Sequence, residues 1–176
     1  MKTIKELLKE DFFTKVDGEI SMYLHEMAFS LVRSLDTRLS YEPTEVSYRG
    51  KVFSTPLSSE AYDLYLEIIG EINLDSGYFS DIFQDILRII FIGPFGAADP
   101  FNDIGRWENT NLGLFMRLAH LHLKFYHGVS FTIQELHILS DIPEEEIANK
   151  LSNCDEDSIS SDRAMSFLKK YRSDIY

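Results

Sequence analysis

Histidines are the residues of this chain best suited to bind a metal ion or to transfer protons near neutral pH. There are five of them: His25, His120, His122, His127 and His137. On a helix, His120 and His122 point in different directions because they are two residues apart. His120 and His127 are two helical turns apart, too far for one zinc ion without a third element between them. The spacing therefore predicts no metal site and favours isolated histidines in solvent or in the core.

Four carboxylates recur at three- and four-residue steps, at Glu60, Asp63, Glu67 and Glu71. This spacing places them on one side of a helix. Helical bundles that hold two metal ions pair such carboxylates with Glu-x-x-His motifs, and the sequence contains none. We therefore predict that the four residues form a solvated acidic face.

Signatures of nucleophilic or nucleotide-dependent catalysis are missing from the sequence. The one cysteine, Cys154, precedes Asp155, Glu156 and Asp157, whose charges disfavour a thiolate. There is no glycine-rich phosphate loop and no Gly-x-Ser-x-Gly motif. We therefore predict a non-enzymatic protein with no catalytic residues and no cofactor.

The overall charge favours a protein partner with a basic surface. The 176 residues include 29 acidic and 17 basic side chains, a net charge of −12, which repels nucleic acid and anionic membranes. The most apolar run, 82–92, contains Asp85 and Arg88 and is too short to span a bilayer. A single cysteine and the lack of a signal-peptide pattern predict a cytoplasmic protein without membrane attachment.

The elements that must position these residues are mostly helices. With 44% hydrophobic residues, the chain can bury a large core without disulfides or metal ions. Apolar spacing predicts helices over 17–39, 78–91 and 107–126. A further helix, which carries the four carboxylates, is predicted to start at 56–58, with Ser58 accepting from the amides of its first turn. Around Gly50, β-branched and aromatic residues predict a short hairpin or, alternatively, an extended loop.

Two further segments have more than one interpretation. Helix 107–126 is apolar on two sides, so it is either central or shared with a second subunit, and a homodimer is a hypothesis. Segment 93–100 contains two glycines and two prolines. It is either a functional loop or, as we favour, a connector bent around a helix end.

The best-patterned stretch is 131–151, which predicts two short helices. Thr132 and Glu135 form a capping box at the first helix start, after Gly128 ends the preceding helix. Pro143 suits the first turn of the second helix. The stretch resembles the helix-turn-helix superfamily of DNA-binding domains, whose small core is formed here by Leu136, Ile142 and Ile147. The resemblance covers about 21 residues, or up to 45 if a helix over 161–172 completes the unit.

The chain departs from that superfamily at several positions. His137 and Asp141 stand where a small residue and a glycine are usual, and 144–146 places three glutamates at the end that would enter the major groove. From Val129 onward, ten acidic and five basic side chains give a net charge of −5. These charges disfavour DNA, although glutamates in a first turn are also favourable to the helix itself.

We predict a mainly α-helical bundle with a possible short β-hairpin, a helical region over 1–128 and a helix-turn-helix-like unit over 129–176 packed on it. The leading hypothesis is an acidic regulator or inhibitor that binds a basic protein partner. Its candidate binding residues are Glu60, Asp63, Glu67, Glu71, Glu144 and Glu145. The alternative is a DNA-binding transcriptional regulator. Its candidate contacts are Asn149, Lys150, Asn153, Lys169, Lys170 and Arg172.

Overall fold

A computed structural model describes residues 3–35, 45–92, 109–151 and 158–172. The helices are α1 (Ile4–Leu7), α2 (Phe12–Leu35), α3 (Pro56–Ile68), α4 (Ser76–Ile86), α5 (Asn111–Tyr126), α6 (Ile133–Ser140), α7 (Glu144–Lys150) and α8 (Ser161–Tyr171). A π-helical segment, η1 (Leu87–Ile92), continues α4, and β1 (Val46–Tyr48) pairs with β2 (Lys51–Phe53). The prediction of a mainly α-helical fold with a short hairpin is confirmed.

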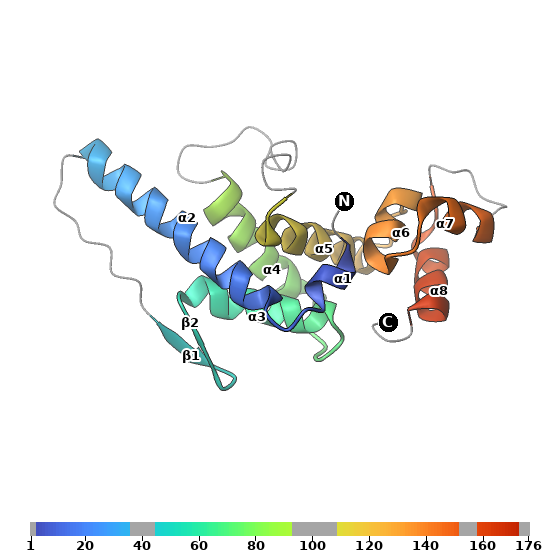
Figure 1. The fold of residues 1–176 in the computed structure, drawn as a ribbon, viewed down its shortest axis with the longest axis horizontal. Helices are drawn as coiled ribbons and strands as arrows, with labels where there is room; N and C mark the ends of the chain where they lie inside the picture. The colour runs from blue at the N-terminus through green and yellow to red at the C-terminus, as the bar shows by residue number, and fades with distance from the viewer. Residues whose placement is uncertain (1–2, 36–44, 93–108, 152–157, 173–176) are drawn as a thin grey trace.

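Helix α5 lies at the centre of the fold, where it contacts α2, α3, α4, α6 and α8 (Figure 1). Both of its apolar sides are buried within the chain. The buried side chains are Leu112, Leu114, Phe115, Met116, Leu118, Ala119, Leu121 and Leu123. The central position alone therefore accounts for the two apolar stripes. A homodimer through this helix stays a hypothesis, but the two apolar sides of α5 no longer support it.

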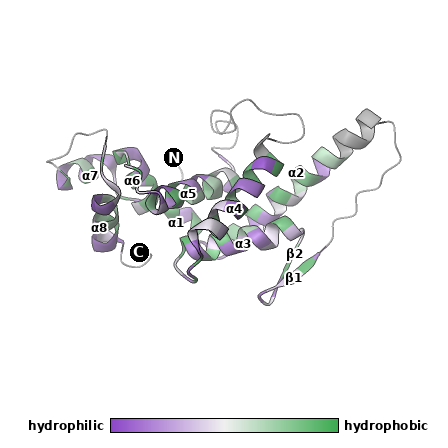
Figure 2. Ribbon diagram, turned by 180° about the vertical axis from the view of Figure 1, so that it is seen from behind, coloured by the Kyte–Doolittle hydropathy of each residue, from purple (hydrophilic) through white to green (hydrophobic). Residues whose placement is uncertain are grey.

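Helix α2 begins five residues before the predicted start and is described to Leu35, so the predicted continuation to Leu39 lies outside the described residues. The extra turn is helical because Phe12, Phe13 and Val16 are buried. The Phe13 ring packs edge-on against Phe115, with ring centroids 6.0 Å apart. This contact joins the start of α2 to the central helix. The hydrophobic positions of the helices are shown in green in Figure 2.

The hairpin forms as predicted, and its turn explains why. Arg49 and Gly50 both have positive φ, 48° and 74°, as a two-residue type I′ turn requires. Val46 pairs with Phe53 in the antiparallel register. After β2, the backbone N–H of Ser54 donates to Asp17 on α2 (3.1 Å), which fixes the end of the hairpin to the body.

The capping residue of α3 stands earlier than predicted, and α4 starts two residues before the predicted Tyr78. Thr55, and not Ser58, is the N-cap of α3: its Oγ1 accepts from the Ser58 N–H at 3.0 Å, and Pro56 follows in the first turn. Asp75 caps α4 by accepting from the N–H of Gly77 at 2.9 Å. The predicted irregular segment 93–100 lies outside the residues that the structure describes.

The last three helices lie at one end of the molecule, opposite the far end of α2 (Figure 1). Gly128 ends the α5 region with a φ of 64°, as predicted. An isolated antiparallel bridge joins the residues before α6 and α8, with N–O distances of 2.7 and 2.8 Å between Phe131 and Ile159. Helix α6 also contacts α1 and α5, so the N-terminal helix and the central helix both pack against this unit.

Candidate functional site

The predicted acidic face of α3 is divided by burial. Glu71 lies beyond α3, which ends at Ile68, so the prediction that one helix carries all four carboxylates is wrong. Glu60 and Glu71 are exposed, but Asp63 is 2% exposed and Glu67 is 8% exposed. The prediction that all four form a solvated, partner-binding face is therefore wrong for Asp63 and Glu67. The hairpin covers Asp63. Helix α5 and the segment before α4 cover Glu67.

Asp63 is held by the hairpin. The Tyr48 hydroxyl donates to its Oδ2 at 2.8 Å, and Arg49 Nε donates to its Oδ1 at 2.9 Å. The Arg49 guanidinium also lies 5.3 Å from the centre of the Tyr48 ring. Both carboxylate oxygens are thus satisfied, so Asp63 joins β1 and its turn to α3 and offers nothing to a partner.

Glu67 joins three segments in the same way. Its Oε2 accepts from the Leu74 N–H at 2.7 Å, and its Oε1 accepts from the Tyr126 hydroxyl at 2.8 Å. His122 Nε2 lies 3.4 Å from the same Oε1. Burial by itself raises the pKa of the Glu67 carboxyl, but the hydrogen bonds from His122, Tyr126 and Leu74 outweigh it and hold that pKa below its usual value. Burial and then the bond to Glu67 raise the pKa of Tyr126.

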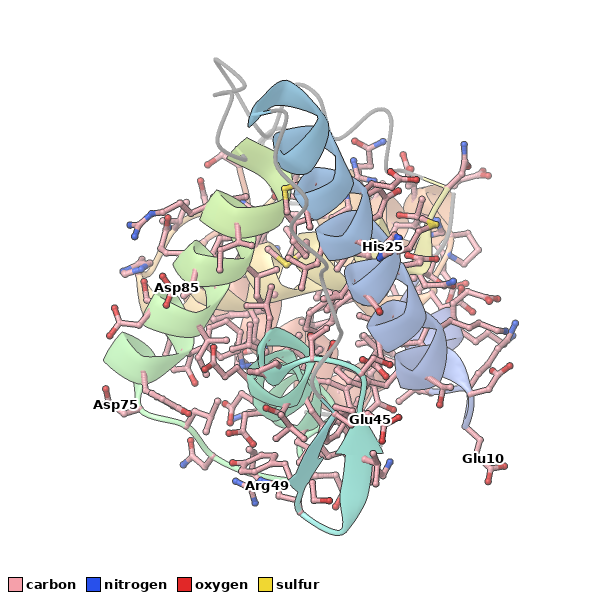
Figure 3. The ribbon with its side chains drawn as sticks, turned by 90° about the vertical axis from the view of Figure 1, so that its left-hand side faces the viewer. Glu10, His25, Glu45, Arg49, Asp75 and Asp85 are labelled. Atoms are coloured by element: carbon pink, nitrogen blue, oxygen red, sulfur yellow. The ribbon has the colours of Figure 1, made fainter. Side chains whose placement is uncertain are left out.

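Helix α4 carries a surface that sequence reasoning missed. Asp75, Tyr78, Asp81 and Asp85 are exposed, and helical spacing brings Tyr78, Asp81 and Asp85 onto one stripe. We call these four residues the α4 acidic face. Figure 3 shows Asp75 and Asp85 along the outer side of α4, away from Glu10. The sequence did contain a signal for this surface. Tyr78, Asp81 and Asp85 recur at three- and four-residue steps, on the side of the helix opposite to the buried Phe79, Phe83 and Ile86.

Tyr78 is the aromatic residue of this face, with 47% of its surface exposed. The pKa of the Tyr78 hydroxyl is raised, mainly because part of the side chain is buried and secondly because of nearby charges such as that of Asp63. Glu60 of α3 is another of these charged groups. Asp85 forms an ion pair with Arg88 at 3.8 Å on the exposed side of α4.

A second exposed acidic set begins α7. Glu144, Glu145 and Glu146 are all exposed in its first turn, where they favour the positive end of the helix dipole. Glu146 is bound to Lys150. Glu144 and Glu145 are thus accessible, and partner binding by them stays a prediction.

The features that carry the helix-turn-helix resemblance have a clear local geometry. Leu136 and Ile147 are fully buried, and Ile142 is partly buried against the same core. The capping box is present, since Thr132 Oγ1 accepts from the Glu135 N–H at 3.2 Å and Glu135 Oε2 accepts from the Thr132 N–H at 2.8 Å. These contacts fix the start of α6.

Both unusual residues of this unit have structural roles. Asp141 ends α6 in the left-handed conformation, with φ of 59°, where a glycine is common. Its carboxylate accepts from the Thr3 hydroxyl and lies 3.7 Å from Lys5 Nζ, which ties α1 to the turn. His137 Nδ1 lies 2.8 Å from the Ile142 carbonyl oxygen, so the imidazole bridges the same turn.

Two of the predicted nucleic-acid contacts, Lys150 and Lys170, lie close together, because both ammonium groups contact the Tyr171 ring. Lys150 is bound to Glu146, and its Nζ lies 4.1 Å from the Tyr171 ring centre. Arg172 Nη1 donates to the Ser140 carbonyl at 2.9 Å, so it closes the end of α6. Exposed side chains are found at Asn149, Lys169 and Lys170, whereas Asn153 lies outside the described residues.

Metal ligands do not cluster in the described part of the chain: no group of three or more histidine, cysteine, aspartate or glutamate side chains there could hold an ion. His122 contacts Glu67 and stacks on Phe79 with ring centres 5.3 Å apart, whereas His25 is exposed on α2 (Figure 3). None of the described helices has both the length and the apolar character needed to cross a membrane.

Comparisons with known proteins give no relative. No family model, no curated protein and no solved structure matches the chain.

Proposed function

We propose that this chain is a non-enzymatic protein-binding factor, a regulator or an inhibitor, whose acidic surface binds a basic protein partner. The α4 acidic face carries the proposal, because it combines exposed carboxylates with a half-exposed tyrosine. Aromatic residues supply much of the binding energy at protein interfaces, and surrounding charges select and orient the partner. Glu60, Glu71, Glu144 and Glu145 add exposed negative charge.

The rival function is DNA binding by the helix-turn-helix-like unit. The buried Leu136 and Ile147 and the left-handed turn at Asp141 favour it. Its electrostatics oppose it: the helix that would enter the major groove begins with three exposed glutamates, and its one lysine is bound to Glu146. Protein binding is therefore the function that the surface supports better.

Protein binding is tested by titrating the chain with a lysine- and arginine-rich peptide that contains aromatic residues. Binding is measured by isothermal titration calorimetry and by the NMR shifts of the chain's amide groups. The double variant Asp81→Lys and Asp85→Lys replaces two of the three carboxylates of the α4 acidic face by ammonium groups and so reverses its charge. We expect its affinity to fall by about tenfold or more, equivalent to about 1.4 kcal/mol.

A matched control carries the same change of charge elsewhere. Glu10→Lys with Glu26→Lys alters two exposed carboxylates on other surfaces. We expect this control to lose much less affinity than the α4 variant. Equal losses in the two variants would mean that only net charge attracts the peptide, and would refute a binding face on α4.

The rival is tested by a mobility shift with duplex DNA at low salt. Lys169→Glu with Lys170→Glu changes two exposed lysines and leaves the structural Arg172 intact. Salt-sensitive binding that this variant abolishes would establish DNA binding in place of our proposal.

A further inference from the structure

A cavity of about 430 Å³ opens between α4, the last turns of α5 and the segment that follows α5. On α4 it is lined by Ser80, Phe83 and Gln84, none of which belongs to the α4 acidic face. Pockets of roughly 300–1,000 Å³ with an apolar lining and a few polar groups are typical of small-molecule sites. The size of this cavity therefore fits a small molecule.

The walls of the cavity favour a flat apolar body with a polar edge. The aromatic wall is the His120 ring, backed by the 1% exposed Phe83 ring, with ring centres 6.1 Å apart and an angle of 35° between them. Leu123 and Val129 supply aliphatic surface. Gln84, together with Ser80 and His127, places hydrogen-bonding side chains in the lining.

The charges around the cavity select against ionic ligands. Lys124 lines it, but the ammonium is bound by both carboxylate oxygens of Glu135, at 2.7 and 2.6 Å. Burial and then the charge of Lys124 lower the pKa of His120, so its imidazole is neutral near pH 7. None of the eight described residues in the lining has a carboxylate, and the Glu135 carboxylate beside it is already bound to Lys124, which disfavours a cation. The chain's net charge of −12 repels anions.

We propose that this cavity binds a small, uncharged aromatic molecule that carries a hydrogen-bonding group. The ring of the ligand packs between the His120 ring and the aliphatic side chains, and its polar group meets Gln84 or Ser80. This site is independent of the proposed protein-binding surface, so either can fail without the other.

The experiment compares three naphthalene compounds that differ in charge: naphthol, naphthoate and naphthylmethylammonium. Each is titrated into the full chain at pH 7 and followed by amide shifts in two-dimensional NMR. We expect naphthol to bind with a Kd on the order of 1 mM or below, as befits a ligand of this size. We expect its shifts to centre on Gln84, His120 and Val129, and the two charged compounds to bind at least about tenfold more weakly.

Two substitutions locate the binding. Val129→Trp fills the cavity from its exposed edge, and Val52→Trp places the same ring on the distant hairpin, where Val52 is 64% exposed. We expect the first to abolish naphthol binding and the second to leave it unchanged. Naphthol that fails to bind, charged compounds that bind equally well, or a Val129→Trp protein that binds normally would each overturn the proposal.

Discussion

The acidic stripe of α3 and the acidic start of α7 have similar compositions and opposite roles. On α3, Asp63 and Glu67 are buried, and each accepts from donors on other elements. On α7, Glu144 and Glu145 are exposed. A carboxylate loses hydration when it is buried, so it needs replacement donors to stay charged. The difference shows that acidic spacing on a helix does not by itself indicate a binding surface.

The strongest test of this comparison is Glu67→Ala. The substitution removes the acceptor of the Leu74 N–H and the closer of the two acceptors of the Tyr126 hydroxyl, which keeps the Leu74 carbonyl at 3.3 Å. We expect the free energy of unfolding to fall by about 3 kcal/mol, because breaking a buried charged network leaves its partners unsatisfied. Urea denaturation measures the change. Glu71→Ala, at an exposed position, is the control and is expected to change stability by less than about 0.5 kcal/mol. Equal effects would contradict the assigned burial.

Asp63→Ala should have the next largest effect. It removes the acceptor of the Tyr48 hydroxyl and of Arg49 Nε, and so loosens the hairpin from α3. We expect a loss of about 2 kcal/mol, less than for Glu67 because Arg49 can regain water. Thermal unfolding and hydrogen exchange at β1 and β2 check this result. A loss no larger than that of Glu60→Ala would place Asp63 with the surface carboxylates.

The pH dependence of stability is a further way to distinguish the buried carboxylates of α3 from the exposed glutamates of α7. Because the pKa of Glu67 is lower in the folded chain than in the unfolded chain, its contribution is fully present above the usual glutamate value of about 4.3. The contribution is lost as the pH falls through the lower pKa of the folded state. Denaturation curves from neutral to acidic pH should therefore decline less steeply below about pH 4.3 in Glu67→Gln than in the wild type. Parallel curves would disprove this linkage.

The smallest effect is expected at α7. Glu144→Gln with Glu145→Gln weakens only the favourable interaction of two exposed carboxylates with the helix dipole. We expect a loss of about 1 kcal/mol or less, which should fade with added salt. Urea denaturation at two salt concentrations is the measurement. A large, salt-independent loss would show that these glutamates have structural partners like those of α3.

The helix-turn-helix-like unit shows why part of the candidate site was not predictable from the sequence. Lys150 and Arg172 are bases that could contact phosphates, yet one is bound to Glu146 and the other closes the end of α6. Arg172 meets the Ser140 carbonyl across 32 residues of sequence. No local pattern reports such a contact. The α4 acidic face, in contrast, follows from helical spacing and was open to prediction.

The sequence by itself determined the elements whose causes are local. Two residues with positive φ close the hairpin, Thr132 and Glu135 cap α6, and the two apolar stripes of α5 require a covered position. Only the tertiary structure decided which carboxylates of α3 are buried and where the cavity beside α5 opens. The physical reason is that spacing along a helix sets the direction of a side chain from its own axis. Burial and available donors depend instead on the elements that pack against that side.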